Sequence, residues 1–256
     1  MWPFRRKPIV DAETAVWHVD NFTWLIRQFS VDEFRQTRLI LPKPGFFPTD
    51  REKGHALALR LFNQIKQYCR MTDWEVDLVL DRNPLAQTQS LSAAMFAPGK
   101  YALGTFAASG NCIQISYVPS LLARPEGFIA TMAHELAHYL LATARGAPPC
   151  EDDEMEFLTD LTAVYLGFGV FLANSRFEFE TMSDGVMHRW RMSRAGYLPE
   201  ADLIYALALF IRAKDLEPET ACACLKPHLA KMLRRAVREL HDDADLIRLR
   251  ELVGRP

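Results

Sequence analysis

The sequence of 256 residues has few cysteines, no excess of charge of one sign, and no long hydrophobic run. Its five cysteines include no CxxC pair, which argues against a disulfide framework and against a structural zinc ribbon. Lys and Arg number 30 and Asp and Glu number 32, so no global field is expected of the kind that holds a protein on nucleic acid. A basic stretch, residues 226–238, is soon offset by acidic residues and is interpreted as a solvated helix face. Nucleic acid is therefore not an expected partner.

The apolar segments are too short to predict a membrane span. The longest, residues 203–211 and 161–173, fall below the ~20 apolar residues that a spanning helix needs. The basic start of the chain leads into Asp11 and Glu13, where a signal peptide would have an apolar region. The sequence therefore predicts a soluble, cytoplasmic protein with no membrane partner, and it leaves the oligomeric state open.

Local patterns predict an α+β protein with a single domain spanning residues 1–256. Residues 1–70 are expected to form an N-terminal α/β extension, residues 71–175 the functional core, and residues 176–256 a helical C-terminal region. Within the extension, short apolar segments and turn signals fill residues 1–50. Prolines and a glycine exclude regular structure near residues 41–48, and apolar spacing predicts a helix over residues 56–69.

In the core, the pattern changes from β-like to helical. Alternation predicts a strand over residues 74–80, and residues 88–118 are β-like, so a small sheet of three or four strands is expected. A long helix is predicted over residues 127–144 and another over residues 155–166. Two glycines in the segment GFG, residues 167–169, are expected to end or bend that second helix. Further helices are predicted from residue 197 to residue 214 and from residue 218 to residue 240, and a last short helical segment is expected before residue 252.

The long helix contains the motif His134-Glu135-Leu136-Ala137-His138, which has the pattern HExxH. Histidines four residues apart lie on one helical face, so both imidazoles can reach one Zn²⁺ ion. Glu135 is placed to accept a proton from a water molecule at the metal, as a general base. The motif predicts a zinc site with His134 and His138 as ligands.

A catalytic zinc ion usually has three protein ligands, and the third is sought downstream of the motif. The metzincin pattern would need Gly at 141 and His at 144, where this chain has Leu141 and Ala144. The next helix instead contains Glu156-Phe157-Leu158-Thr159-Asp160, an ExxxD pattern that sets Glu156 and Asp160 on one face. We expect Glu156 to bind the metal and Asp160 to accept a hydrogen bond from a ligand histidine.

These two motifs resemble those of the gluzincin metallopeptidases, the thermolysin-like clan, and their short separation resembles the compact minigluzincins of bacterial type. The resemblance covers residues 74–169. It implies a zincin-like fold, in which a small sheet packs on the active-site helix. It also implies zinc bound by His134, His138 and Glu156. The strand before the helix, near residues 111–117, would be the edge to which an extended peptide adds.

Several other interpretations of the same residues stay open. The two histidines could be buried without a metal, and Glu156 could only favour the helix N-terminus as one of a run of acidic residues. Glu154 is a reserve third ligand, although no acid follows it four residues later. Cys150 could complete a structural site with the two histidines. No motif identifies the residue that stabilises the oxyanion, for which the candidates are Tyr165, Arg176, His188 and Tyr197.

The expected function is that of a zinc-dependent metallohydrolase, a peptidase that cleaves peptide or protein substrates with water activated by Glu135. The alternative is a latent or non-catalytic regulatory or binding protein that retains the scaffold. An open groove along the strand would favour the peptidase, whereas a closed site would favour the alternative.

Overall fold

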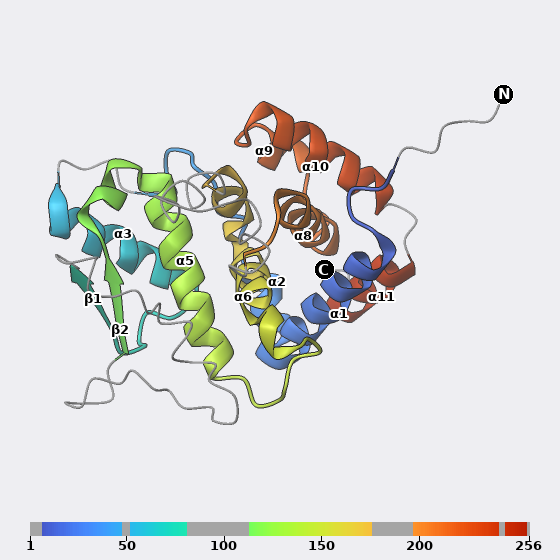
Figure 1. The fold of residues 1–256 in the computed structure, drawn as a ribbon, viewed down its shortest axis with the longest axis horizontal. Helices are drawn as coiled ribbons and strands as arrows, with labels where there is room; N and C mark the ends of the chain where they lie inside the picture. The colour runs from blue at the N-terminus through green and yellow to red at the C-terminus, as the bar shows by residue number, and fades with distance from the viewer. Residues whose placement is uncertain (1–6, 48–51, 81–112, 176–196, 241–243, 255–256) are drawn as a thin grey trace.

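The computed structural model describes residues 7–47, 52–80, 113–175, 197–240 and 244–254, which are coloured in Figure 1. Most of them lie in helices, and a small parallel sheet of two strands lies at one end of the molecule. The α+β class and the helical C-terminal region agree with the prediction from sequence.

The N-terminal region is helical, and this corrects the expected α/β extension. It contains α1 (Ala12–Phe29), α2 (Val31–Gln36) and α3 (Gly54–Tyr68), with no strand among its described residues. Of these, only α3 was predicted. The apolar side chains that α1 buries recur at helical spacing: Val19, Phe22, Leu25 and Ile26. Asp11 caps the helix by accepting a hydrogen bond from the Thr14 backbone at 2.9 Å. Both the spacing and the cap are signals that the sequence contains.

The sheet consists of β1 (Val76–Leu80) and β2 (Ile113–Tyr117), paired in parallel. The register matches Val76 with Ile113, and the middle residues Leu78 and Ile115 are both buried. Parallel neighbours need a long connection, and the two strands are far enough apart in the sequence to allow one. The further strands predicted within residues 88–112 lie outside the described part of the chain.

The predicted active-site helix is α5 (Pro125–Ala142), which begins with proline at its first position and is buried around most of its surface. It packs against α6 (Met155–Ala163), and both stand between the sheet and the C-terminal helices (Figure 1). The helical segment Asp152–Ser175, which contains α6, has the length and hydropathy of a membrane span. This helical segment is longer than the apolar run of residues 161–173, which by itself is too short to span a membrane. However, 83% of its most apolar stretch is buried inside the protein, as in any core helix.

Of the two glycines after α6, Gly167 bends the helix, whereas Gly169 has a helical φ of −55°. The segment Val164–Phe168 contains a kink, because Gly167 has a non-helical φ of 97°, and helix then runs on to residue 175. The backbone N–H of Ile40 donates to the Gly167 carbonyl at 2.9 Å. A Cβ on Gly167 would lie 2.0 Å from the Arg38 carbonyl oxygen, so the crossing of these two segments requires glycine.

The C-terminal helices are α8 (Glu200–Ala213), α9 (Pro218–Cys222), α10 (Pro227–Glu239) and α11 (Ala244–Val253). The single helix predicted over residues 218–240 is therefore wrong. Pro227 has no N–H to continue a helix and begins α10 instead. Asn174 stabilises the connection between α9 and α10. Its amide NH₂ donates to the Cys224 carbonyl at 2.8 Å, and its Oδ1 accepts from the Lys226 backbone N–H at 3.0 Å.

Candidate metal centre

The two histidines of the motif lie on the same face of α5 and are almost fully buried. His134 is 7% exposed and His138 is 2% exposed. Their rings are nearly perpendicular, and the two Nε2 atoms lie 3.1 Å apart. The helix therefore directs both imidazoles toward one point, as the spacing predicted, and in each ring the nitrogen that faces this point is Nε2.

Glu156 lies in the first turn of α6 and completes a triangle of donor atoms. Its Oε2 lies 3.3 Å from Nε2 of His134 and 3.4 Å from Nε2 of His138. In a tetrahedral site with bonds of ~2.0 to 2.1 Å, two ligand atoms are about 3.3 to 3.4 Å apart. The two separations that involve Glu156 match this range, the Nε2–Nε2 distance of 3.1 Å is slightly shorter, and this group could hold a metal ion.

The Nδ1 atoms of both histidines contact oxygen atoms of α6. Nδ1 of His134 lies 2.9 Å from Oδ1 of Asp160, and Nδ1 of His138 lies 3.2 Å from Oγ1 of Thr159. A carboxylate oxygen accepts, so the proton of neutral His134 sits on Nδ1. Asp160 is itself held in place, because its Oδ2 accepts from the Leu198 backbone N–H at 2.8 Å.

Three acceptors without hydrogens would meet at the centre of this triangle. When both imidazoles are neutral with hydrogen on Nδ1, their Nε2 atoms carry lone pairs, and the Glu156 oxygen is also an acceptor. Such an arrangement in a buried place requires a cation or a proton between the atoms. The donor set and its orientation therefore fit a metal ion.

Without a metal, the acidic neighbours strongly favour a proton on His134. Burial by itself lowers the pKa of His134, but hydrogen bonds to Asp160 and Glu156, with the charges of Asp160 and Glu135, outweigh it and raise the pKa to about 10. Burial raises the pKa of Glu156, but hydrogen bonds to both histidines reverse the effect and hold that pKa far below its usual value. A metal ion must therefore displace a proton from the centre.

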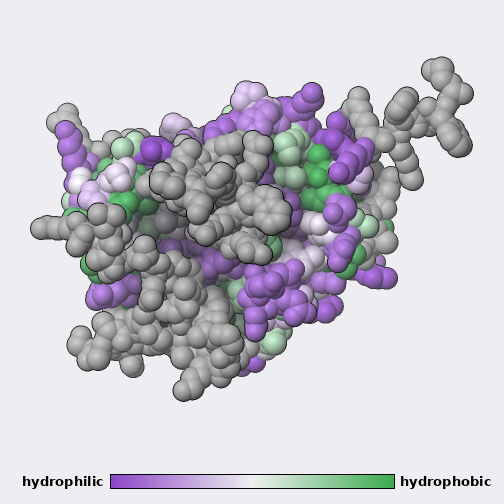
Figure 2. Space-filling view, in the orientation of Figure 1, coloured by the Kyte–Doolittle hydropathy of each residue, from purple (hydrophilic) through white to green (hydrophobic). Residues whose placement is uncertain are grey.

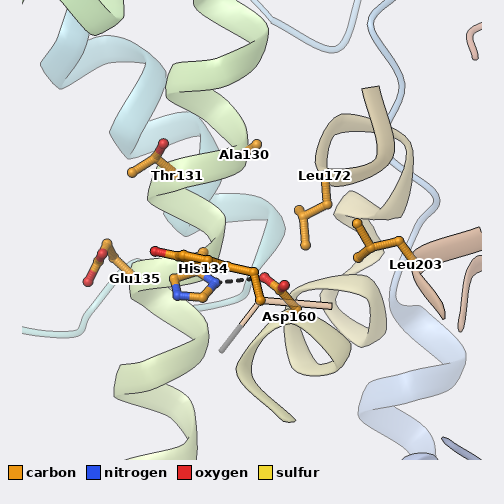
Figure 3. Close-up of a pocket in the computed structure, with 8 residues that line it drawn as sticks. Ala130, Thr131, His134, Glu135, Asp160, Leu172 and Leu203 are labelled. Carbon is orange, nitrogen blue, oxygen red and sulfur yellow. Dashed lines mark hydrogen bonds and ion pairs between the residues drawn. The ribbon is translucent and has the colours of Figure 1, made fainter. Parts of the chain in front are cut away.

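A small cavity of about 30 Å³ lies beside His134. Glu135 and Tyr197 contribute to its wall, with apolar side chains such as Leu172 and Leu203. Figure 3 shows His134 directed toward Asp160, whereas Glu135 leaves α5 in a different direction. The cavity has room for a water molecule next to a potential ligand and the predicted general base.

Two of the candidates for oxyanion stabilisation belong to the described residues, and of these Tyr197 lies at the centre. The Tyr197 ring lies 5.3 Å from the His134 ring. Tyr165 belongs to an aromatic cluster, where it stacks on Phe34 at 5.3 Å, and burial raises its pKa. Arg176 and His188 lie outside the described residues.

The two alternative ligands, Glu154 and Cys150, make contacts away from the two histidines. Glu154 accepts hydrogen bonds from the Glu151 backbone at 2.9 Å and from the Trp17 indole at 3.0 Å. The Cys150 thiol contacts the sulfur of Met155. Burial, followed by the charges of neighbouring acids, raises the pKa of Cys150 to about 12, which disfavours the thiolate that a metal needs.

The basic stretch of α10 includes cations that pair with acidic side chains. Arg234 makes two hydrogen bonds of 2.7 Å to Glu219, and Arg235 bonds to Glu239 at 2.8 Å. On the face shown in Figure 2, hydrophilic residues are spread over the described surface, with smaller hydrophobic areas between them. These pairs agree with the interpretation of a solvated helix face.

Two groups at the centre were not singled out in the sequence. Thr159 immediately precedes Asp160, and a hydroxyl among the apolar residues of this helix was a usable signal. The Leu198 contribution comes from its backbone, for which the sequence contains no signal.

Neither a protein-family model, nor a curated protein, nor a solved structure matches this chain. The assignment of the centre therefore depends on the motifs and on their geometry in this molecule.

Proposed function

We propose that the protein is a zinc-dependent metallohydrolase of the gluzincin type that cleaves peptide bonds. One observation carries the proposal. The atoms Nε2 of His134, Nε2 of His138 and Oε2 of Glu156 form a triangle with sides of 3.1, 3.3 and 3.4 Å, and the general base of the HExxH motif lies next in the chain.

The donor set favours zinc among the common metal ions. Two imidazoles and one carboxylate are a set of ligands found in catalytic zinc sites, which leave a fourth position open. Calcium and magnesium prefer oxygen ligands, so the two histidines argue against them. Asp160 accepts a hydrogen bond from His134, the partner that zinc-binding histidines usually have.

In the proposed hydrolysis, different residues hold the metal ion, transfer the proton and bind the substrate oxygen. A zinc ion held by the two histidines and Glu156 would act as a Lewis acid that polarises a carbonyl group and acidifies water. Glu135 would take a proton from the attacking water and return it to the leaving nitrogen as the C–N bond breaks. Tyr197 lies on the wall of the same cavity, and we assign to it the hydrogen bond to the substrate oxygen.

The proposed substrate is an extended peptide or protein segment. The resemblance to gluzincins assigns the peptide to the edge of the strand before the active-site helix, which in this chain is β2. Backbone hydrogen bonds at such an edge recognise a polypeptide irrespective of its side chains. The zincin-like arrangement of sheet and helix is part of the same proposal.

Replacing Glu135 with Gln tests the catalytic assignment. The amide side chain keeps nearly the same shape as the carboxylate but cannot accept the proton, so we expect zinc content to stay the same and peptide cleavage to fall ~10²- to 10⁴-fold. Cleavage of a peptide library, with elemental analysis of each protein, is the measurement. Glu126→Gln, in the exposed first turn of the same helix, is the matched control and should cleave like wild type. Equal cleavage by zinc-loaded wild type and Glu135→Gln would refute the mechanism.

A latent or non-catalytic binding protein is the second candidate function, and the burial of the site favours it. Both histidines are buried, and the cavity of about 30 Å³ is far smaller than a peptide. If this function is right, wild type and Glu135→Gln should both bind zinc, lack cleavage, and retain the same partners in a pulldown.

A further inference from the structure

We infer that Thr159 is a positioning residue that fixes the tautomer of His138 for metal binding. The inference rests on the proposed metal centre and concerns a residue that neither motif includes. Thr159 is completely buried in α6, and its side chain contacts both its own helix and the imidazole of α5.

The hydroxyl hydrogen of Thr159 is committed to its own helix. Oγ1 lies 2.8 Å from the Met155 carbonyl oxygen, which can only accept. Because a hydroxyl has a single hydrogen, its contact with Nδ1 of His138 at 3.2 Å must use an oxygen lone pair. Nδ1 of His138 is therefore the donor, and in the neutral ring Nε2 is left with a lone pair that faces Nε2 of His134.

The two histidines thus reach the same tautomer through different partners. Asp160 orients His134 with a negative charge, whereas Thr159 orients His138 with a neutral hydroxyl. Because this partner is neutral, the negative charges near the centre in the described part of the chain are those of Asp160, Glu156 and the neighbouring Glu135. Removal of the hydroxyl would leave Nδ1–H of His138 buried without this acceptor, so the ring would gain by moving its proton to Nε2, where a metal must bind.

The chain contains a matched control for this hydroxyl. Thr162 lies in the same helix, is also completely buried, and donates to the Leu158 carbonyl at 2.7 Å. Its hydroxyl makes the same type of bond within the helix as that of Thr159. Thr159→Val and Thr162→Val therefore each remove one helix-bonded hydroxyl, but only the first removes the contact of Oγ1 with a ligand histidine.

The test measures Zn²⁺ affinity by competition with a chromophoric chelator. We expect Thr159→Val to bind zinc ~10- to 100-fold more weakly than wild type. Thr159→Ser, which keeps the hydroxyl, should recover most of the loss, and Thr162→Val should bind like wild type. A slowly exchanging Nδ1–H resonance of His138 should be present in the NMR spectra of zinc-loaded wild type and Thr159→Ser, and should exchange faster in Thr159→Val.

The outcomes separate this inference from the proposed function. If wild type binds zinc and Thr159→Val binds it equally well, the positioning role is refuted while the metal centre stands. If Thr162→Val loses as much affinity as Thr159→Val, the effect is that of helix stability and the positioning role is again refuted. If wild type does not bind zinc, both proposals fail.

Discussion

Asp160 has a donor for each of its two carboxylate oxygens, the imidazole of His134 and the backbone N–H of Leu198. An asparagine has one oxygen and one NH₂ group, so it can accept from only one of these donors. We expect Asp160→Asn to weaken zinc binding ~10- to 100-fold while the fold is largely retained. Competition with a chelator measures the affinity, and circular dichroism reports the fold.

A second buried histidine beside an aspartate gives a control for this substitution. Nε2 of His18 in α1 lies 3.4 Å from Oδ1 of Asp202 in α8, and His18 is fully buried. Asp202→Asn should lower the free energy of unfolding without a change in zinc affinity. Zinc binding unchanged in Asp160→Asn would show that this aspartate does not support the centre.

Residue roles could be predicted where they follow from helical spacing. The faces of His134, His138, Glu156 and Asp160 are set by their separations within two helices, and the structure brings these side chains together as expected. The partner of His138 could not be assigned in this way. Which residue of α6 reaches its Nδ1 depends on how the two helices pack.

At the scale of elements, the bend after α6 depends on Gly167. Its φ of 97° disfavours other residues, and a Cβ would lie 2.0 Å from the Arg38 carbonyl oxygen. We expect Gly167→Ala to lower the free energy of unfolding by about 2 to 4 kcal/mol, from backbone strain and displacement of the segment that bonds through Ile40. Chemical denaturation measures the change.

Gly169, two residues further along the same helix, is the matched control. Its φ of −55° is helical, and a Cβ would meet the side chains of Leu207 at 3.1 Å and Val164 at 3.2 Å. These contacts can relax by small side-chain movements, and alanine favours the helix by up to ~1 kcal/mol. Gly169→Ala should therefore cost much less than Gly167→Ala, and equal costs would contradict the role given to the bend.

At the scale of the whole molecule, metal binding and stability should be linked through His134. In the metal-free protein its folded pKa is about 10, above the ordinary value of 6.5. A raised histidine pKa contributes stability that is full below pH ~6.5 and is lost as the pH rises toward 10. A zinc ion at the proposed centre would compete with this proton, so the stabilisation by zinc should grow over the same interval.

The measurement compares chelated wild type with chelated His134→Gln between pH 6.5 and 10. The free energy of unfolding of wild type should fall relative to the variant by a few kcal/mol, on the order expected for a buried group with such a shift. Burial lowers the pKa of Lys214 to about 8, so this lysine titrates in the same interval, but it is present in both proteins and cancels. A constant difference across the interval would show that His134 carries no raised pKa.

The sequence by itself determined the chemistry of the centre and the periodicity of its helices. HExxH and ExxxD identify the candidate donor residues, because spacing along a helix decides which residues share a face. The tertiary structure decided which nitrogen of each ring faces the centre, that Tyr197 and the Leu198 backbone arrive there, and that Tyr165 stays among aromatic rings. These contacts join segments far apart in the chain, and their geometry comes from packing between helices, which local patterns do not encode.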